Sequence, residues 1–153
     1  MEKAPQTKKK NEQASSARKI KTQGAVMQPL FFIPKMSKKN NPTYKDLQVV
    51  DNLYPKRKYS VSISIPEFNC VCPKTGLPDF GCIDINYVPN KFIVELKSLK
   101  LYIVKYRHVG IFHEEVTNKI LDDFKRAAMP RSIDIRGSFH PRGGIKTTVN
   151  CNE

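Results

Sequence analysis

The sequence predicts a single α+β domain in which two helices cover one face of a four-stranded antiparallel sheet. Three observations point to this class. Apolar and polar residues alternate near both ends of the region after residue 42, apolar residues recur at helical spacing between these parts, and turn residues separate the segments. The expected order is strand, strand, helix, helix, strand, strand, a pattern typical of α+β domains.

The first two strands are expected to form a hairpin. Residues Tyr59–Ile65 alternate, with apolar side chains on one face and serines on the other, and Pro66 is expected to end this strand. The second alternating run is Phe80–Val88. The two runs can pair in antiparallel fashion, with the loop between them at the mouth of the hairpin. A short strand could also begin upstream, near residues 47–50.

The middle of the chain changes from strand to helical spacing. Leucine, isoleucine and aromatic residues recur at this spacing over Phe92–Val109 and again over Phe112–Met129, which predicts two helices. Alternation returns at residues 133–135 and 145–149, and the glycines of Arg142–Gly144 predict a turn between them. Because the outer strands of so small a sheet lack partners, we expect several copies to close a barrel across subunits.

Composition bounds the domain count and the compartment. The 153 residues suffice for one domain, the mean hydropathy is −0.49, and no apolar run is long enough to span a membrane. The N-terminus lacks the apolar segment of a secretory signal. Two of the four cysteines, Cys70 and Cys72, are too close together for an ordinary structural disulfide. These features favour a reducing, cytoplasmic setting.

The charge is strongly positive and unevenly distributed. The net charge is +13 and the sequence pI about 9.7, with much of the excess in the first forty-odd residues. We expect residues 1–42 to be a basic, disordered extension and residues 43–153 to be the single folded domain. An apolar cluster at residues 30–34 interrupts the extension. The extension can contact RNA weakly, although we do not expect the activity to require nucleic acid.

A short loop combines a thiol and a carboxylate. Cys72 and Asp79 flank two prolines and Gly76, which restrict the backbone and supply a turn. A loop of this kind can hold a nucleophile and a proton donor in a fixed relation, as covalent catalysis requires. Taken alone, Cys72 is more simply a small buried residue and Asp79 a turn residue.

Three further segments contain groups suited to binding. Residues Glu95–Tyr102 place lysines and a serine at a helix start, where anions bind, although periodicity alone favours a solvated helix face. Phe112–Glu115 sets a histidine beside carboxylates, which suits either a polar heterocycle or helix capping. Arg142–Gly144 offers a guanidinium and exposed backbone to a phosphate, a common arrangement in loops.

Together these segments resemble one family. The order and separation of Cys-Pro-x-Thr-Gly-x-Pro-Asp-Phe, Glu-Leu-Lys-Ser-Leu-Lys-Leu-Tyr, Phe-His-Glu and Arg-Gly-Gly-Ile, from about Pro66 to Ile145, is similar to that of the 7-cyano-7-deazaguanine reductases. These are NADPH-dependent nitrile reductases of queuosine biosynthesis. The resemblance implies the tunnelling fold, an assembly of stacked rings, a small deazapurine substrate, NADPH as cofactor and no metal.

The resemblance also implies a role for each residue. It makes Cys72 the nucleophile and Asp79 the proton donor. The segments expected to bind substrate contain Val94, Glu95, Leu96, His113 and Glu114. The residues expected to bind the cofactor are Lys97, Ser98, Lys100, Tyr102, Arg142, Gly143 and Gly144.

This chemistry explains the residue types. A nitrile carbon accepts hydride poorly, and addition of a thiolate turns it into a thioimide, which accepts hydride better. Cys72 must therefore ionise readily, and Asp79 must hold a proton until it reaches the nitrile nitrogen. Two successive hydrides then give the aminomethyl product, and water must be excluded in between.

Other functions remain open from the sequence. A tRNA deazaguanine amidinotransferase of the same fold uses the same cysteine but lacks the Glu-Leu-Lys-Ser segment. A zinc cyclohydrolase would take Cys82, His113 and one of Cys70 and Cys72 as ligands. A non-enzymatic RNA-binding module would depend on the basic extension. Cys70 and Cys82 are extra thiols relative to the family, and we expect Cys70 to be inert.

Overall fold

The computed structural model describes Met1 and residues 41–153. The predicted basic extension therefore lies almost wholly outside the described residues, as does its apolar cluster at residues 30–34. Within the described part, no helix combines the length and the apolar character needed to cross a membrane.

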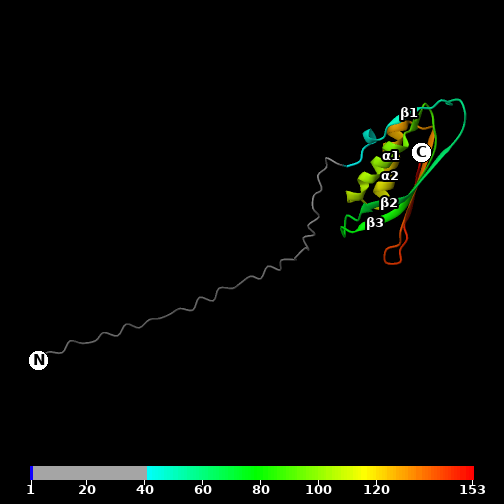
Figure 1. The fold of residues 1–153 in the computed structure, drawn as a ribbon. Coiled ribbons are helices and arrows are strands. Elements are labelled where there is room, and N and C mark those ends of the chain that lie inside the picture. The colour runs from blue at the N-terminus through cyan, green and yellow to red at the C-terminus, as the bar shows by residue number, and fades with distance from the viewer. Residues whose placement is uncertain (2–40) are drawn as a thin grey trace. The chain divides into compact units, whose positions relative to one another are not determined.

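The core of the fold is a four-stranded antiparallel sheet with the strand order β2-β3-β5-β6 (Figure 1). Its strands are β2 (Val61–Val71), β3 (Pro78–Val88), β5 (Ser132–Phe139) and β6 (Thr148–Asn152). The predicted α+β class and antiparallel pairing are therefore confirmed. Strands β2 and β6 form the two edges of this sheet, and among the described residues the outer side of β2 is bridged at its last residue, where Val71 pairs with Gly110.

A second, two-stranded sheet joins β1 (Val49–Asp51) to β4 (Phe92–Val94). The sequence indicated only that a strand could start near β1. It missed β4, because a strand of three residues is too short to show alternation. The prediction that the first helix begins at Phe92 was therefore wrong.

Strand β2 continues past the proline that was expected to end it. The pairing register with β3 shifts between Ile65 and Phe68, which marks a β-bulge. Pro66 lies within this irregularity, where a residue without an N–H group does not interrupt a regular ladder. The strand then runs to Val71, so the connecting loop is only residues 72–77.

The two helices are α1 (Leu96–Lys105) and α2 (His113–Ala128), joined by a 3-10 turn, η3 (Tyr106–His108). Helix α2 matches its prediction closely, and it ends where Met129 takes a left-handed conformation with φ 46°. Helix α1 starts after Glu95. The Glu95 side chain accepts hydrogen bonds from backbone N–H groups in the first turn, which have no partner within the helix.

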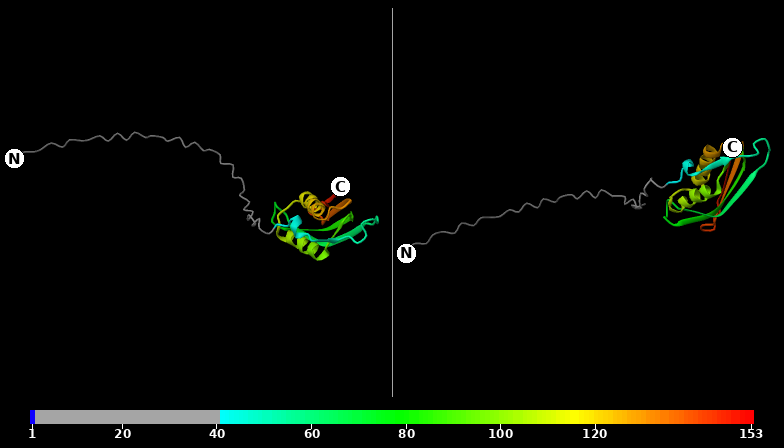
Figure 2. Two further views of the ribbon diagram at one scale, coloured as in Figure 1. Left: turned by 90° about the horizontal axis from the view of Figure 1, so that it is seen from above. Right: turned by 45° about the horizontal axis from the view of Figure 1, so that its top comes forward.

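The helices cover one face of the sheet, and the core lies between the two layers (Figure 2). Along β3 and β5 the buried side chains alternate, as the period-two pattern predicted. The largest fully buried side chains are Tyr87, Tyr102, Tyr106, Phe68, Phe124 and Phe139. Helix α2 packs closely on the sheet at Gly137, where a Cβ atom would lie 2.6 Å from Thr117 Oγ1.

Candidate active site

The loop of residues 72–77 holds Cys72 at the end of the β2–β3 hairpin. The Cys72 backbone N–H donates to the Leu77 carbonyl at 2.8 Å, and its carbonyl accepts from the Gly76 N–H at 2.9 Å. Gly76 has φ 71°, a conformation that glycine adopts without strain. The loop therefore closes on itself around the thiol.

The Cys72 thiol is partly exposed, and its surroundings favour the thiolate over the thiol. Hydrogen bonding by the Thr75 side chain, assisted by the backbone N–H groups of Thr75 and Lys74, lowers the pKa of Cys72 below its ordinary value. Partial burial and the negative charge of Asp79 oppose this effect without cancelling it. Cys72 therefore has the thiolate character of a nucleophile.

Cys70, two residues earlier, has the opposite character. Its side chain is fully buried, and the Sγ atom lies 3.9 Å from the Ile111 carbonyl oxygen. Burial, together with the charges of Asp79 and Cys72, raises the pKa of Cys70 to about 12. A thiol in this state is unreactive at neutral pH, in keeping with the expectation that Cys70 is inert.

Asp79 is the charged centre of this end of the sheet. It lies opposite Cys70 in the β2–β3 ladder and is only 5 % exposed. Its Oδ1 atom lies 2.6 Å from Arg142 Nε, and its Oδ2 atom lies 3.5 Å from His113 Nε2. Three segments distant in the sequence therefore meet at one carboxylate.

Arg142 starts the predicted glycine turn between β5 and β6. Arg142 and Ile145 exchange backbone hydrogen bonds of 2.9 and 3.0 Å, and Gly143 and Gly144 have φ 56° and 81°. The guanidinium also donates to the Pro78 carbonyl. The sequence predicted the turn and a cofactor role for Arg142, but gave no sign that its side chain contacts Asp79.

His113, the first residue of α2, lies flat on an aromatic ring. Its imidazole stacks on Phe139 with ring centroids 3.8 Å apart and planes 2° from parallel. Its Nε2 atom is buried and has no hydrogen-bond partner among the described residues. Sequence reasoning missed Phe139, because only the strand register shows that this residue lies beneath the histidine.

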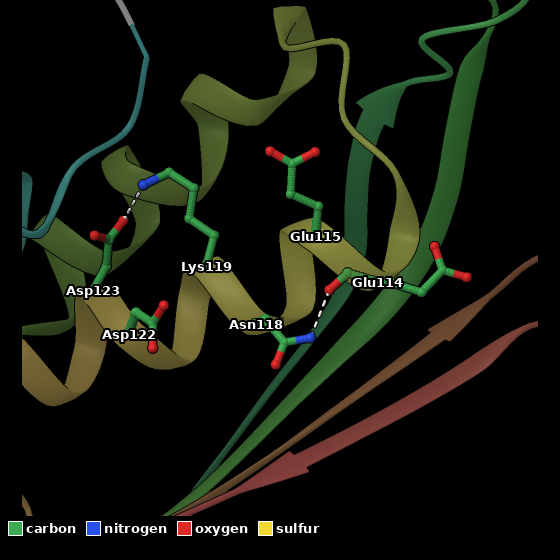
Figure 3. Close-up of a pocket in the computed structure, with 6 residues that line it drawn as sticks. All are labelled: Glu114, Glu115, Asn118, Lys119, Asp122 and Asp123. Atoms are coloured by element: carbon green, nitrogen blue, oxygen red, sulfur yellow. Dashed lines mark hydrogen bonds and ion pairs between the residues drawn. The ribbon is translucent and has the colours of Figure 1, made fainter.

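Glu114 and the outer face of α2 form an open acidic groove (Figure 3). Glu114 and Glu115 are exposed, and Lys119 pairs with Asp123 at 2.9 Å. In Figure 3 the Glu114 carboxylate points away from the lysine. The predicted substrate residue Glu114 is therefore adjacent to His113 in the chain and free to contact a ligand.

The start of α1 departs from its predicted role as an anion site. Glu95 accepts hydrogen bonds of 2.7 Å from the backbone N–H groups of Lys97 and Ser98, and these bonds lower the pKa of Glu95. The N–H groups expected to hold a phosphate are thus already occupied by a carboxylate. Of the neighbouring residues expected to line the substrate pocket, Val94 is buried and Leu96 is exposed.

Two of the predicted cofactor residues have structural roles in the fold. The Ser98 hydroxyl donates to the Glu95 carbonyl at 2.7 Å and accepts from the Gln48 N–H at 3.0 Å. The Tyr102 hydroxyl is buried between Tyr106 and Asp123, at 2.8 Å from each. Direct cofactor contact by Ser98 or Tyr102 is therefore not supported, whereas the lysines Lys97 and Lys100 are exposed.

The structure does not bring the two groups of predicted site residues together in one chain. The Val94 N–H donates to the Tyr87 hydroxyl at 3.4 Å, which places the start of α1 near the far end of β3. Tyr87 and Asp79 are separated along β3 by roughly 26 Å of extended strand. Cys72, Asp79, His113 and Arg142 therefore form one cluster, and Glu95 with the two lysines forms another.

The ligands of the zinc alternative do not converge. The Cys82 sulfur lies 3.4 Å from the Ser64 hydroxyl and 3.5 Å from an Asp84 oxygen, on the face of the sheet opposite the helices. Cys70 is buried on the helix side. Within residues 41–153, no three histidine, cysteine, aspartate or glutamate side chains are grouped to hold a metal ion.

Comparison with known proteins identifies the class that this fold and site define. Residues 78–153 match the family model described as QueF-like protein. Among solved structures, the archaeosine synthase QueF-Like in the apo form aligns with a TM-score of 0.57 and 22% identity, over 61% of this chain and 91% of that one. This likeness supports the tunnelling fold.

The family follows from three curated relatives, each named NADPH-dependent 7-cyano-7-deazaguanine reductase. The protein of Chlorobaculum tepidum is 53% identical over 106 residues, 69% of this chain and 91% of the relative. That of Thermomicrobium roseum is 52% identical over 107 residues (70% and 84%), and that of Elusimicrobium minutum 49% over 109 residues (71% and 82%). The chain belongs to the family of NADPH-dependent 7-cyano-7-deazaguanine reductases.

Proposed function

We propose that the protein reduces the nitrile of 7-cyano-7-deazaguanine to the aminomethyl group of 7-aminomethyl-7-deazaguanine, with NADPH, in queuosine biosynthesis. The observation that carries this proposal is that Cys72, whose pKa is lowered, lies at the same end of the hairpin as Asp79, close enough for the Asp79 charge to act on the thiol. It occurs in a chain about half identical to the named reductases.

The proposed reaction begins at Cys72. The thiolate adds to the nitrile carbon and forms a C–S bond, while Asp79 gives a proton to the nitrile nitrogen, so that C≡N becomes the C=N–H of a thioimide. The lowered pKa of Cys72 raises the fraction of thiolate that is present at neutral pH. A first hydride and a proton would reduce the C=N bond, the C–S bond would then break to return the Cys72 thiol and leave an imine, and a second hydride and a proton would give the aminomethyl group.

The role of Asp79 requires a movement of Arg142. With Arg142 Nε at 2.6 Å, the Asp79 carboxyl group is held by the guanidinium and is not available to the nitrile nitrogen. The predicted roles of the two residues are compatible if the guanidinium leaves Asp79 when the site fills and turns to a cofactor phosphate. The exposed Arg142–Ile145 turn, with two glycines at positive φ, lies where such a movement would not disturb the sheet.

The surface of α1 fits a phosphate-bearing cofactor through its side chains. Between α1 and the edge strand β2 lies a groove of about 340 Å³, lined mainly by apolar residues, and its charged lining residues are Lys100, Arg107 and Glu67. Lys97 is exposed nearby, so these cations would hold the NADPH phosphates. When bound, NADPH supplies the hydrides. Ser98 and Tyr102 support the cofactor site by fixing α1 to its neighbours.

The substrate is expected to lie between the two clusters. The free Nε2 of His113 and the exposed carboxylate of Glu114 would hold the polar edge of the deazapurine. Val94, Glu95 and Leu96 would line the pocket from the start of α1. Because the two clusters lie far apart within a single chain, we propose that each site takes one cluster from one subunit and the other cluster from a neighbouring subunit.

A homo-oligomer of stacked rings is consistent with the free surfaces of the chain. Apart from the bridge at Val71, strands β2 and β6 are open edges, and Leu96, Leu101 and Val104 expose apolar surface on α1. Edge pairing would close the barrel that a single sheet leaves open. The proposed catalytic domain is 43–153, and we propose a cytoplasmic location in which the four free thiols stay reduced.

The direct test follows NADPH absorbance with the nitrile substrate and identifies the product by mass. We expect stoichiometric oxidation of two NADPH per aminomethyl product, no turnover by Cys72→Ala, and normal turnover by Cys82→Ala. Oxidation without the aminomethyl product would contradict the proposal. Amine-dependent conversion of deazaguanine already in tRNA, without NADPH, would instead support the amidinotransferase.

A further inference from the structure

We propose that Phe139 is a positioning residue for His113, which holds the imidazole at a fixed tilt beside Asp79. This inference rests on the proposed function, in which His113 contacts the substrate. The two rings are 3.8 Å apart and 2° from parallel, so the whole imidazole face lies on the phenyl face. Phe139 is only 1 % exposed, so the surrounding core holds its phenyl ring in place.

Two glycines make room for the Phe139 ring. Gly81 lies opposite Phe139 in the β3–β5 ladder, and a Cβ atom at Gly81 would come within 3.0 Å of Phe139 Cδ1. A Cβ atom at Gly137 would come within 2.9 Å of Phe139 Cε2. The ring therefore fills space above the sheet that side chains at these two positions would otherwise occupy.

The backbone of His113 is fixed by a separate contact. Thr117, fully buried one turn further along α2, donates from its hydroxyl to the His113 carbonyl at 2.8 Å. Thr117 also lies directly above Gly137. The start of α2 is thus held through Thr117 and the imidazole through Phe139.

The consequence concerns the direction of one nitrogen. With the ring plane held by stacking, His113 Nε2 faces Asp79 Oδ2 at 3.5 Å and is left without a hydrogen-bond partner among the described residues. A buried nitrogen of this kind is satisfied when a ligand atom arrives. Loss of the stack would let the imidazole turn, which weakens substrate binding more than the chemistry at Cys72.

The first test needs no substrate. In the NMR spectrum of the wild-type protein, the His113 ring protons should lie upfield of those of exposed His108, because they sit over the Phe139 ring. In Phe139→Leu this upfield shift should disappear, while the control Phe124→Leu should retain it. Phe124 is an equally buried phenylalanine that packs on Tyr87, and it lies near the other end of α2. Ordinary His113 shifts in the wild type would overturn the stacked arrangement.

The second test measures the KM of the nitrile substrate. Phe139→Leu should raise it by about 2- to 10-fold, the range expected for loss of one aromatic pair, with a smaller change in kcat. Phe124→Leu, which truncates an equally buried phenylalanine, should keep the wild-type KM. An unchanged KM in an active Phe139→Leu enzyme would overturn the positioning role. If the wild type does not reduce the nitrile but the NMR shifts are as expected, the proposed function is overturned. The stacking of His113 on Phe139 is then still supported.

Discussion

Arg142 Nε lies 2.6 Å from Asp79 Oδ1, which joins the glycine turn after β5 to the start of β3. The carboxylate is almost fully buried, and the guanidinium is its nearest positive charge. Sequence motifs assign Arg142 to the cofactor and Asp79 to proton transfer. Because the two side chains are in contact, a change at Arg142 is expected to affect both cofactor binding and Asp79.

Replacing Arg142 should separate these roles. We expect Arg142→Gln to raise the KM for NADPH by about 10- to 100-fold, as for loss of one charge-assisted hydrogen bond. Covalent addition of substrate to Cys72 without cofactor should persist, because the Asp79 carboxyl group, no longer held by the guanidinium, stays available to the nitrile nitrogen. The exposed Arg136→Gln serves as control. An unchanged KM for NADPH together with lost addition would instead show that Arg142 serves only to hold Asp79.

Three of the four thiols, Cys72, Cys70 and Cys151, should differ in the pH at which iodoacetamide alkylates them. The pKa of Cys72 is lowered, whereas burial raises the pKa of Cys70 to about 12 and also raises that of Cys151. Cys72 should therefore react at lower pH than Cys70 and Cys151, as peptide mass mapping can show. Thr75→Val removes the main stabilising hydroxyl and should move the Cys72 profile toward 9.0. A profile unaffected by Thr75→Val would contradict the hydrogen-bond origin of the shift.

The Glu95 cap should make stability depend on pH. Its pKa is lowered in the folded state, so the unfolded chain binds a proton more readily. The stabilisation is then fully present above the unfolded value of 4.5 and is lost as pH falls through the folded value. The difference in Tm between wild type and Glu95→Gln should be largest at neutral pH and shrink below pH 4.5. A difference independent of pH would exclude an ionised cap; Glu67→Gln on the β-bulge is the control.

A methyl group at Gly137 should disturb the contact between β5 and α2. The Cβ atom of Gly137→Ala would lie 2.6 Å from Thr117 Oγ1 and 2.9 Å from Phe139 Cε2, so neighbours must shift. We expect a loss of about 1–3 kcal/mol in the free energy of unfolding, measured in urea. Gly110→Ala, whose nearest contact is 3.8 Å, should change stability by less than about 0.5 kcal/mol. Equal effects would argue against the close approach.

Mixed oligomers test whether sites are shared between subunits. Cys72→Ala and Glu95→Ala should each be inactive, but co-expressed they should regain activity, because some sites would receive Cys72 from one subunit and Glu95 from its neighbour. Cys72→Ala with Asp79→Asn is the matched control and should stay inactive, since both residues belong to the same hairpin. Activity from neither mixture would place both clusters in one subunit.

Periodicity was sufficient to predict the main elements of the fold. The alternation of Ile83, Ile85 and Tyr87 and the helical spacing of α2 both matched the structure, because each element buries one continuous face. The bulge at Pro66 was not predictable, since a proline ends a regular strand unless the ladder shifts there. Strand β4 was missed because its pairing with β1 depends on contacts distant in sequence.

The sequence was sufficient to predict which residues belong to the candidate site, but not which of them contact one another. Motif resemblance indicated Cys72, Asp79 and His113, and the structure brings Asp79 and His113 within 3.5 Å. The Phe139 platform and the Arg142–Asp79 ion pair depend on strand register and a turn conformation, which leave no local signature. Tyr102 belongs to the segment expected to bind the cofactor, but its side chain is buried because it lies on the face of α1 that packs into the core.

The most direct test of covalent catalysis is the intact mass of the protein after incubation with 7-cyano-7-deazaguanine and no cofactor. Addition of a thiol to a nitrile loses no atoms, so the mass should rise by that of one whole substrate molecule per chain. Peptide mapping should place this mass on Cys72, and Cys72→Ala should show none. An enzyme that reduces the nitrile with NADPH yet never carries this mass on Cys72 would contradict the account.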